Sequence, residues 1–412
     1  MSATQVHELH AADGRVAVRR VSLDSGARLS RALLSYLVVL IASLLLLPFG
    51  FVVPERLAPA YAFTPLGTLA TLAMFVPYGF LSRRARTGRA GQHVLSIVAS
   101  GGLLALALET AQLFEPSCEA SPWHLLAAMA GAGLGAWLCA RAHEDEYGTS
   151  NAVHAMLLQL PLMGLTYLLL PLLWASGAAA QGDPARLALT VSIGLMGASI
   201  LGSVARAIRG YTPDRAPWMV PAVALLWSAI GMLPSLLVDW RITLGGMALI
   251  TAFASWRGRW SAPPFQERRY ETPALLSAAP FMALYFVGAG IWPGHSFRSN
   301  PLVHLGMPVS EAGLALALPL LEMGIAATVL GYVVAEFNGR SESALRDILA
   351  RVLAQACVAL VLVEVARSFF GFEGASLLRV VLALGAAAYG AMLYHLQRAH
   401  VKVMARRIAP SR

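Results

Sequence analysis

The sequence predicts an all-α, polytopic helical membrane protein of about twelve transmembrane helices, and three observations support this fold class. Hydrophobic residues make up 57% of the 412-residue chain and charged residues only 13%, whereas a soluble domain carries about 25% charge. Apolar runs of about 20 residues, long enough to cross the hydrocarbon layer, recur along the whole chain. Short polar segments between these runs hold most of the arginines. We therefore take the bilayer as the solvent of this fold.

Twelve apolar runs are expected to form the spans. The first follows an arginine-rich tail and is too long for the core of a signal peptide, so it is expected to stay as an anchor. The seventh and eighth could instead form one re-entrant hairpin, which would leave the other assignments intact. The predicted spans are 32–53, 64–81, 94–114, 125–142, 153–175, 187–204, 218–238, 242–256, 273–293, 312–335, 347–367 and 376–397.

The basic residues predict an N-in, C-in topology. When the 31 Lys and Arg residues are assigned to the two sides of these spans, 25 fall on the side of the termini. Cytoplasmic loops carry such an excess. The net charge of +9 therefore sets orientation and does not indicate a nucleic-acid-binding face. The arginines left outside are Arg56, Arg186, Arg241, Arg298, Arg367 and Arg379.

Two motifs in the first four spans resemble a known family. Phe75-Val76-Pro77-Tyr78-Gly79-Phe80 stands in the second span, and Glu109-Thr110-Ala111-Gln112-Leu113-Phe114-Glu115-Pro116 leads through a short loop to Gly131-Ala132-Gly133-Leu134-Gly135. They resemble F-x-P-x-G-F and E-x-x-Q-L-F-x-P…G-x-x-x-G of the VanZ family, which is named from a glycopeptide-resistance protein and typically has four helices. The chain departs from the family pattern at Cys118, His124 and Ala128, where the family has Arg, Asp and Asn.

An internal alignment predicts a second, degenerate version of this unit in the C-terminal region. One constant offset aligns Glu109 with Glu364, Phe114 with Phe369, Ala120-Ser121 with Ala375-Ser376 and Gly135 with Gly390, and replaces Gln112 by Arg367. Both units would start inside and span four times, which predicts a parallel repeat in a four-plus-four-plus-four arrangement. The predicted regions are a cytosolic tail at 1–31, the first unit at 32–145, a central segment of about four helices at 146–260, the second unit at 261–400 and a cytosolic tail at 401–412.

Three carboxylates inside the spans, Glu109, Glu322 and Glu364, are the main candidates for a binding site, because ionisable residues are costly there. Gln112 lies one helical turn from Glu109, so the two polar groups share a face. Glu322 stands nearest the centre of its span, where a buried carboxyl could suit proton coupling. No cationic partner is visible in the sequence, so the alternative is that this carboxyl is simply neutral. The structural alternative is that these groups form hydrogen bonds between neighbouring helices.

Two polar groups on the outer side are further candidates. His124 ends the loop that starts at Cys118, and Arg298 stands near His295 and His304 in the longest outer loop. They could bind an anionic envelope lipid or glycan, and the alternative is a solvated turn anchored by Trp123. The glycines at 131–135 and at 385 and 390 fit helix packing, not a nucleotide loop. No catalytic triad order, phosphate loop or metal-ligand spacing is present, so no cofactor or metal is predicted.

The resemblance implies a multi-pass protein of the bacterial cytoplasmic (inner) membrane that is linked to surface glycoconjugates or to glycopeptide tolerance. The leading hypothesis is non-enzymatic, with membrane lipids and a lipid-linked glycan as partners and no nucleic acid. A second hypothesis is a proton-coupled transporter or flippase, which requires a water-accessible cavity containing one of the carboxylates. A third is a membrane enzyme acting on lipid-linked sugars, which requires polar groups converging at one membrane face.

Overall fold

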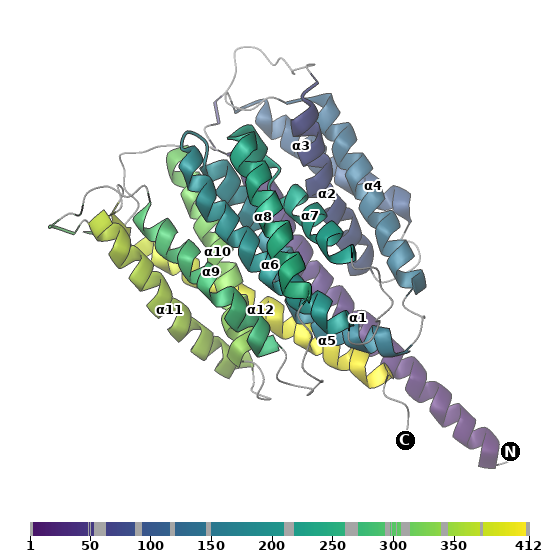
Figure 1. Cartoon of the computed structure of the whole chain (residues 1–412). Coiled ribbons are helices and arrows are strands. Elements are labelled where there is room, and N and C mark those ends of the chain that lie inside the picture. Colours follow the sequence, from purple (N-terminus) through teal and green to yellow (C-terminus); the bar gives the residue numbers. More distant parts are fainter. Residues whose placement is uncertain are drawn as a thin grey trace.

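The computed structural model describes residues 3–47, 49, 51–52, 63–86, 93–115, 120–145, 150–209, 218–259, 271–292, 297, 299–301, 303–305, 314–338, 345–370 and 374–408. Over these residues the chain forms a bundle of helices that run side by side, with the N-terminal end of α1 extending beyond the others (Figure 1). The helices are α1 (Ala3–Leu46), α2 (Pro65–Ala85), α3 (Val94–Gln112), α4 (Pro122–Asp145), α5 (Ser150–Ala179), α6 (Leu187–Arg209), α7 (Met219–Gly231), α8 (Trp240–Arg259), α9 (Glu271–Ile291), α10 (Leu314–Asn338), α11 (Leu345–Phe370) and α12 (Leu377–Ile408).

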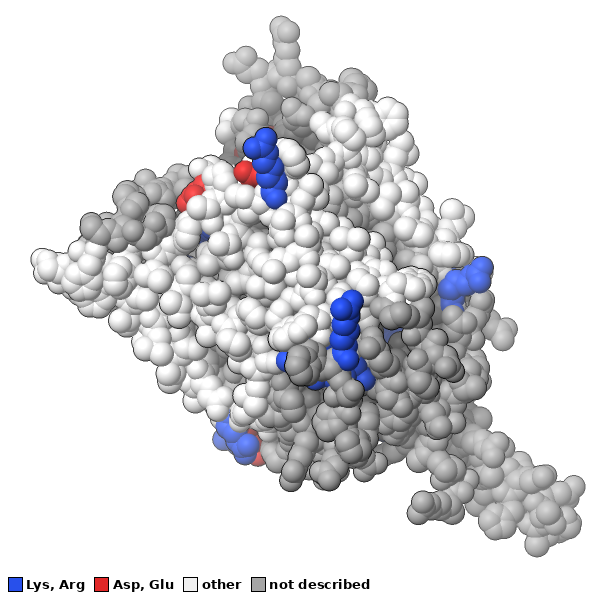
Figure 2. Space-filling view, in the orientation of Figure 1, with Lys and Arg blue, Asp and Glu red and all other residues white. Residues whose placement is uncertain are grey.

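The prediction of a helical, multi-pass membrane protein is confirmed. Within the described residues, nine helices are long and apolar enough to cross a bilayer. α8 is also helical but has an arginine near each end and does not reach that degree of apolarity. Figure 2 shows a broad uncharged area over the described part of one face, with few charged side chains. Such a surface suits lipid and not water.

The seventh predicted span, 218–238, is not one continuous helix. α7 ends at Gly231, and a short 3₁₀ helix, η3 (Pro234–Leu237), follows it. Pro234 has no backbone N–H and cannot continue the hydrogen-bond ladder of a helix. The first span also differs, because α1 begins at Ala3 within the predicted tail and ends at Leu46, seven residues before the predicted limit.

One small element breaks the all-α description. β1 (Val303–His304) and β2 (Ala375–Ser376) form a parallel pair, with Val303 opposite Ala375 and His304 opposite Ser376. Two residues are too few for a sequence pattern to reveal a strand. The pair brings part of the connection between α9 and α10 beside the start of α12.

Two helix pairs, α2 with α4 and α10 with α12, pack at backbone contact. A Cβ atom added to Gly135 of α4 would overlap the carbonyl of Val76 in α2, and one added to Gly390 of α12 would overlap the carbonyl of Thr328 in α10. Gly131 likewise faces α2, so the expected packing role holds there. It is wrong for Gly385, which has open space beside it.

The central helix α5 packs against helices of the C-terminal region. It contacts α6, α10 and α12, and its buried leucines belong to the main hydrophobic core. α1 and α12 also meet directly: the rings of Tyr36 and Tyr389 stack with centroids 6.1 Å apart. The hydroxyl of Tyr389 donates to the carbonyl of Ala32 at 2.7 Å. The first and last helices of the chain therefore contact each other directly.

Candidate functional site

Glu364, on α11, is held by two arginines. Nε of Arg379 lies 3.1 Å from one carboxylate oxygen, and Nη2 of the same side chain donates to the other oxygen at 3.1 Å. Arg367, one turn further along α11, approaches at 3.3 Å. Glu364 is 4% exposed and Arg379 is 2% exposed. Charges this deeply buried are tolerated only when they are paired and hydrogen-bonded.

The Glu364 carboxylate also receives a hydrogen bond from the backbone. The N–H of Ser376 donates to it at 2.8 Å, and Ser376 stands directly before α12. The first N–H groups of a helix lack partners inside the helix, and negative charge is favourable at this end. The carboxylate therefore fixes the start of α12 to the end of α11.

Glu109, on α3, makes a similar set of contacts with weaker partners. The N–H of Ser121, directly before α4, donates to its carboxylate at 2.6 Å. Nδ1 of His124 lies 3.4 Å from the other oxygen. Gln112 does not join Glu109, because its amide donates to the carbonyl of Leu45 in α1 at 2.8 Å. Glu109 thus fixes the start of α4, and Gln112 fixes the end of α1.

Glu322 has a cationic partner, so the expectation that none would be present is wrong. Nη2 of Arg186 donates to its carboxylate at 2.6 Å, and the hydroxyl of Tyr285 donates to the other oxygen at 3.0 Å. Arg186 belongs to a short 3₁₀ helix, η2 (Pro184–Arg186), which lies 136 residues earlier in the sequence. Asp183 caps this turn and also accepts from the indole of Trp292 at 3.0 Å.

A cavity of about 20 Å³ adjoins Glu322 and is also lined by Tyr285, Met323 and Arg367. A cavity needs about 10–15 Å³ measured in this way to hold one water molecule. The cavity therefore has room for one water, and it lies between the Glu322 pair and the arginine that faces Glu364.

The ion pairs explain three of the arginines that the topology analysis left outside. Arg186, Arg367 and Arg379 pair with Glu322 or Glu364. The sequence offered one signal for these ion pairs, namely arginines on the outer side together with carboxylates inside the spans. This signal could not show which arginine pairs with which carboxylate. These residues stabilise contacts between helices and do not set orientation alone.

The remaining predicted site residues are distributed as follows. His124 also lies 3.5 Å from the hydroxyl of Thr64, just before α2. His304 stands opposite Ser376 and so close to the Glu364 contacts. Arg298, His295 and Cys118 lie outside the described residues. Among the residues that the structure describes, no three His, Cys, Asp or Glu side chains are grouped to share a metal ion.

Comparison of the chain with protein-family models, with curated proteins and with solved structures finds no match. The fold and the buried ion pairs define the class of a multi-pass helical membrane protein. A more specific function has to be argued from the residues themselves.

Proposed function

We propose that the chain is a VanZ-like protein of the bacterial cytoplasmic membrane, with both termini in the cytosol and two parallel four-helix units around a central segment. Support comes from the agreement between the motif residues of the two units. Glu109 and Glu364 each accept an N–H from the residue twelve positions later and meet a basic side chain fifteen positions later. Glycines of the second and fourth helices make equivalent backbone contacts in both units.

The function that we propose is non-enzymatic support of surface-glycoconjugate assembly or of glycopeptide tolerance. The VanZ resemblance supplies the envelope role, and membrane lipids or a lipid-linked glycan are the proposed partners. The single observation that favours a scaffold over a catalyst concerns the three carboxylates predicted as site residues, which all make contacts between helices or helix ends: Glu322 and Glu364 pair with arginines, and Glu109 lies against His124. Residues engaged in this way position helices and are not available to a substrate.

The test is a bacterial strain from which the gene has been deleted. We expect higher glycopeptide susceptibility or an altered surface polysaccharide, and full rescue by the wild-type chain. Glu109→Gln and Glu322→Gln, assayed at membrane levels matched to the wild type, are expected to rescue as well, since a scaffold requires the folded protein in the membrane and no carboxylate that carries a proton. An unchanged envelope in the deletion strain would reject the proposal.

One observation favours a proton-coupled transporter as a second candidate. Glu322 and Arg367 both line the water-sized cavity. Under this hypothesis Glu322→Gln would insert at wild-type levels and yet abolish rescue. Proton uptake by liposomes containing the wild-type chain, lost with Glu322→Gln, would establish it and replace the scaffold proposal.

A further inference from the structure

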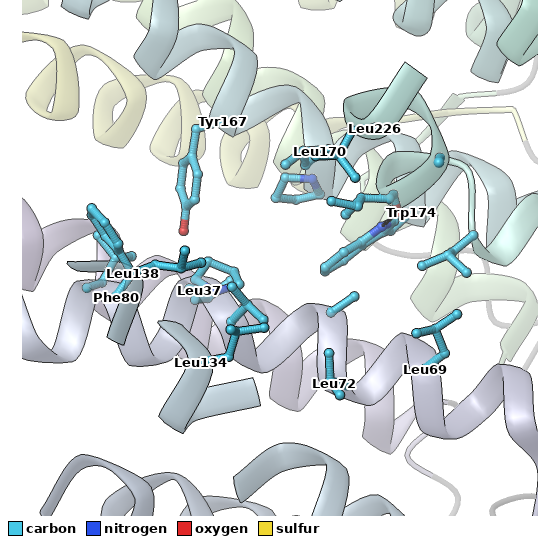
Figure 3. A pocket seen from close by; sticks show the side chains of 18 of the residues that line it. Leu37, Leu69, Leu72, Phe80, Leu134, Leu138, Tyr167, Leu170, Trp174 and Leu226 are labelled. Atoms are coloured by element: carbon cyan, nitrogen blue, oxygen red, sulfur yellow. Dashed lines mark hydrogen bonds between the residues drawn. The ribbon is translucent and has the colours of Figure 1, made fainter. Parts of the chain in front are cut away.

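A large apolar groove separates the first four-helix unit from the central helices. Its volume is about 910 Å³, within the range of about 300–1,000 Å³ that is typical of ligand sites. Helices α1, α2 and α4 form one wall, and α5, α7 and α8 form the other. Figure 3 shows Leu37, Leu72 and Leu134 facing Leu170 and Trp174 across the open space.

The groove opens toward the lipid. Five of its lining leucines are exposed although they lie in apolar helices: Leu69, Leu134, Leu138, Leu226 and Leu244. In a membrane protein, an acyl chain can enter such a groove sideways from the bilayer.

The VanZ-like motif in α2 divides between the protein core and this groove. Phe75 and Tyr78 are buried against the core, whereas Val76, Pro77 and Phe80 line the groove. Half of the motif thus holds α2 in place, and the other half shapes the groove.

The length of the groove matches one leaflet. It follows α2 from Leu69 to Leu81, and twelve residues of helix span about 18 Å. One leaflet contributes about half of the roughly 30 Å hydrocarbon core. The acyl chains of a phospholipid therefore fit along the groove, whereas a much longer polyprenyl chain would extend beyond it.

A single hydroxyl group points into the groove. The oxygen of Tyr167 is buried, and it has no hydrogen-bond partner among the residues that the structure describes. Figure 3 shows this oxygen pointing across the pocket towards the side of Leu37 and Leu138. A buried hydroxyl without a partner is costly. An ester carbonyl of a lipid would satisfy it.

Arginines stand one turn beyond the same end of the groove. Arg141 follows Leu138 by three residues on α4, and Arg83 follows Phe80 by three residues on α2. Arg141 lies over the ring of Trp137, and Arg83 donates to the carbonyl of Ala136. These contacts do not neutralise the guanidinium groups. Positive charge therefore stands where the head group of a lipid in the groove would lie.

We infer that this groove binds one anionic glycerophospholipid from the leaflet on the arginine-rich side, with its acyl chains along Val76, Pro77 and Phe80. The Tyr167 hydroxyl donates to an ester carbonyl, and Arg83 and Arg141 face the phosphate. This site is separate from the ion-paired carboxylates, so it does not depend on the function proposed for the chain.

Native mass spectrometry of the full chain in detergent tests the inference. The protein is mixed with equal amounts of phosphatidylglycerol and phosphatidylcholine that carry the same acyl chains. We expect one retained phosphatidylglycerol, favoured over phosphatidylcholine by at least about fivefold, the effect of one arginine near an anionic surface. Equal retention of the two lipids by the wild-type chain would overturn the inference.

Two matched pairs of variants locate the lipid. Arg141→Gln should lower the preference about fivefold, whereas Arg241→Gln should not, although Arg241 also lies over a neighbouring tryptophan. Leu134→Trp, in the groove, should reduce bound lipid, while Leu106→Trp, at an equally exposed site on α3, should not. A larger loss with Arg241→Gln or with Leu106→Trp would overturn the assignment. So would stronger retention of a polyprenyl phosphate than of phosphatidylglycerol.

Discussion

Helices α2 and α10 each make a close backbone contact on one face, but the burial of their remaining surface differs. Gly79 of α2 and Gly331 of α10 both abut a backbone carbonyl, of Ala132 in α4 and of Ala387 in α12. Yet 39% of the residues in the apolar window of α2 are buried, against 67% in α10. A helix that makes this backbone contact can therefore have the rest of its surface largely exposed, as in α2, or largely buried, as in α10.

The difference in burial between α2 and α10 is found at the positions of α2 that line the groove. Taking Gly79 and Gly331 as equivalent, Val76, Pro77 and Phe80 correspond to Thr328, Val329 and Tyr332. The three residues of α2 are only partly buried, and those of α10 are fully buried. α5 covers α10 so closely that a Cβ atom on Gly164 would overlap the Tyr332 hydroxyl. The position of α5 leaves the groove open at the first unit only.

The carboxylate sites of Glu109 and Glu364 also differ in burial, and the C-terminal site is again the more buried. Glu364 faces two arginines, and its side chain is 5% exposed, whereas Glu109 faces one histidine, and its side chain is 14% exposed. The Glu364 site is thus the more deeply buried and the more strongly charged of the two. Substitutions in equivalent positions should have unequal effects.

The largest expected effect is that of Glu364→Gln. Removing one member of a buried ion pair leaves uncompensated charge and costs about 3–5 kcal/mol, and here Arg367 and Arg379 would both lose their partner. The measurement is denaturant or thermal unfolding of the purified chain in detergent. Glu109→Gln is the matched control, with an expected loss of about 1 kcal/mol, because the amide can still accept from Ser121. Equal losses would contradict the difference between the two sites.

A smaller loss of stability is expected at the backbone contacts, and it should be equal for α2 and α10. Gly79→Ala and Gly331→Ala should each destabilise the chain by about 1–3 kcal/mol, because the added methyl group overpacks a helix contact. Gly385→Ala has open space and replaces a glycine inside a helix. It should therefore be neutral or slightly stabilising. A loss confined to one unit would show that the two helix pairs are not equivalent.

The smallest effect is expected for His124→Gln. A partly exposed pair between Glu109 and His124 contributes about 0–1 kcal/mol, and the Ser121 N–H remains on the carboxylate. Arg379→Gln, at the equivalent position of the second unit, should cost several times more in the same unfolding measurement. The comparison would fail if His124→Gln proved the more damaging of the two.

Composition and glycine spacing were enough to predict the helical membrane character of the chain and one of its helix contacts. Apolar runs have to become helices in lipid, because each backbone group there needs a partner within its own segment. The glycines at 131 and 135 could be assigned to helix packing, since small residues four apart admit a neighbouring backbone. The constant offset between Glu109 and Glu364 also drew attention to two carboxylates that make similar contacts.

Only the tertiary structure decided which distant residues meet. Arg186 and Glu322 are 136 residues apart, and no local pattern could join them, because an ion pair needs opposite charges and proximity but no fixed spacing. The break after α7 and the two-residue strands were also beyond the sequence. The groove is formed by residues that look like ordinary lipid-facing leucines. Whether such a face is sealed or open depends on where α5 packs, which no single helix can specify.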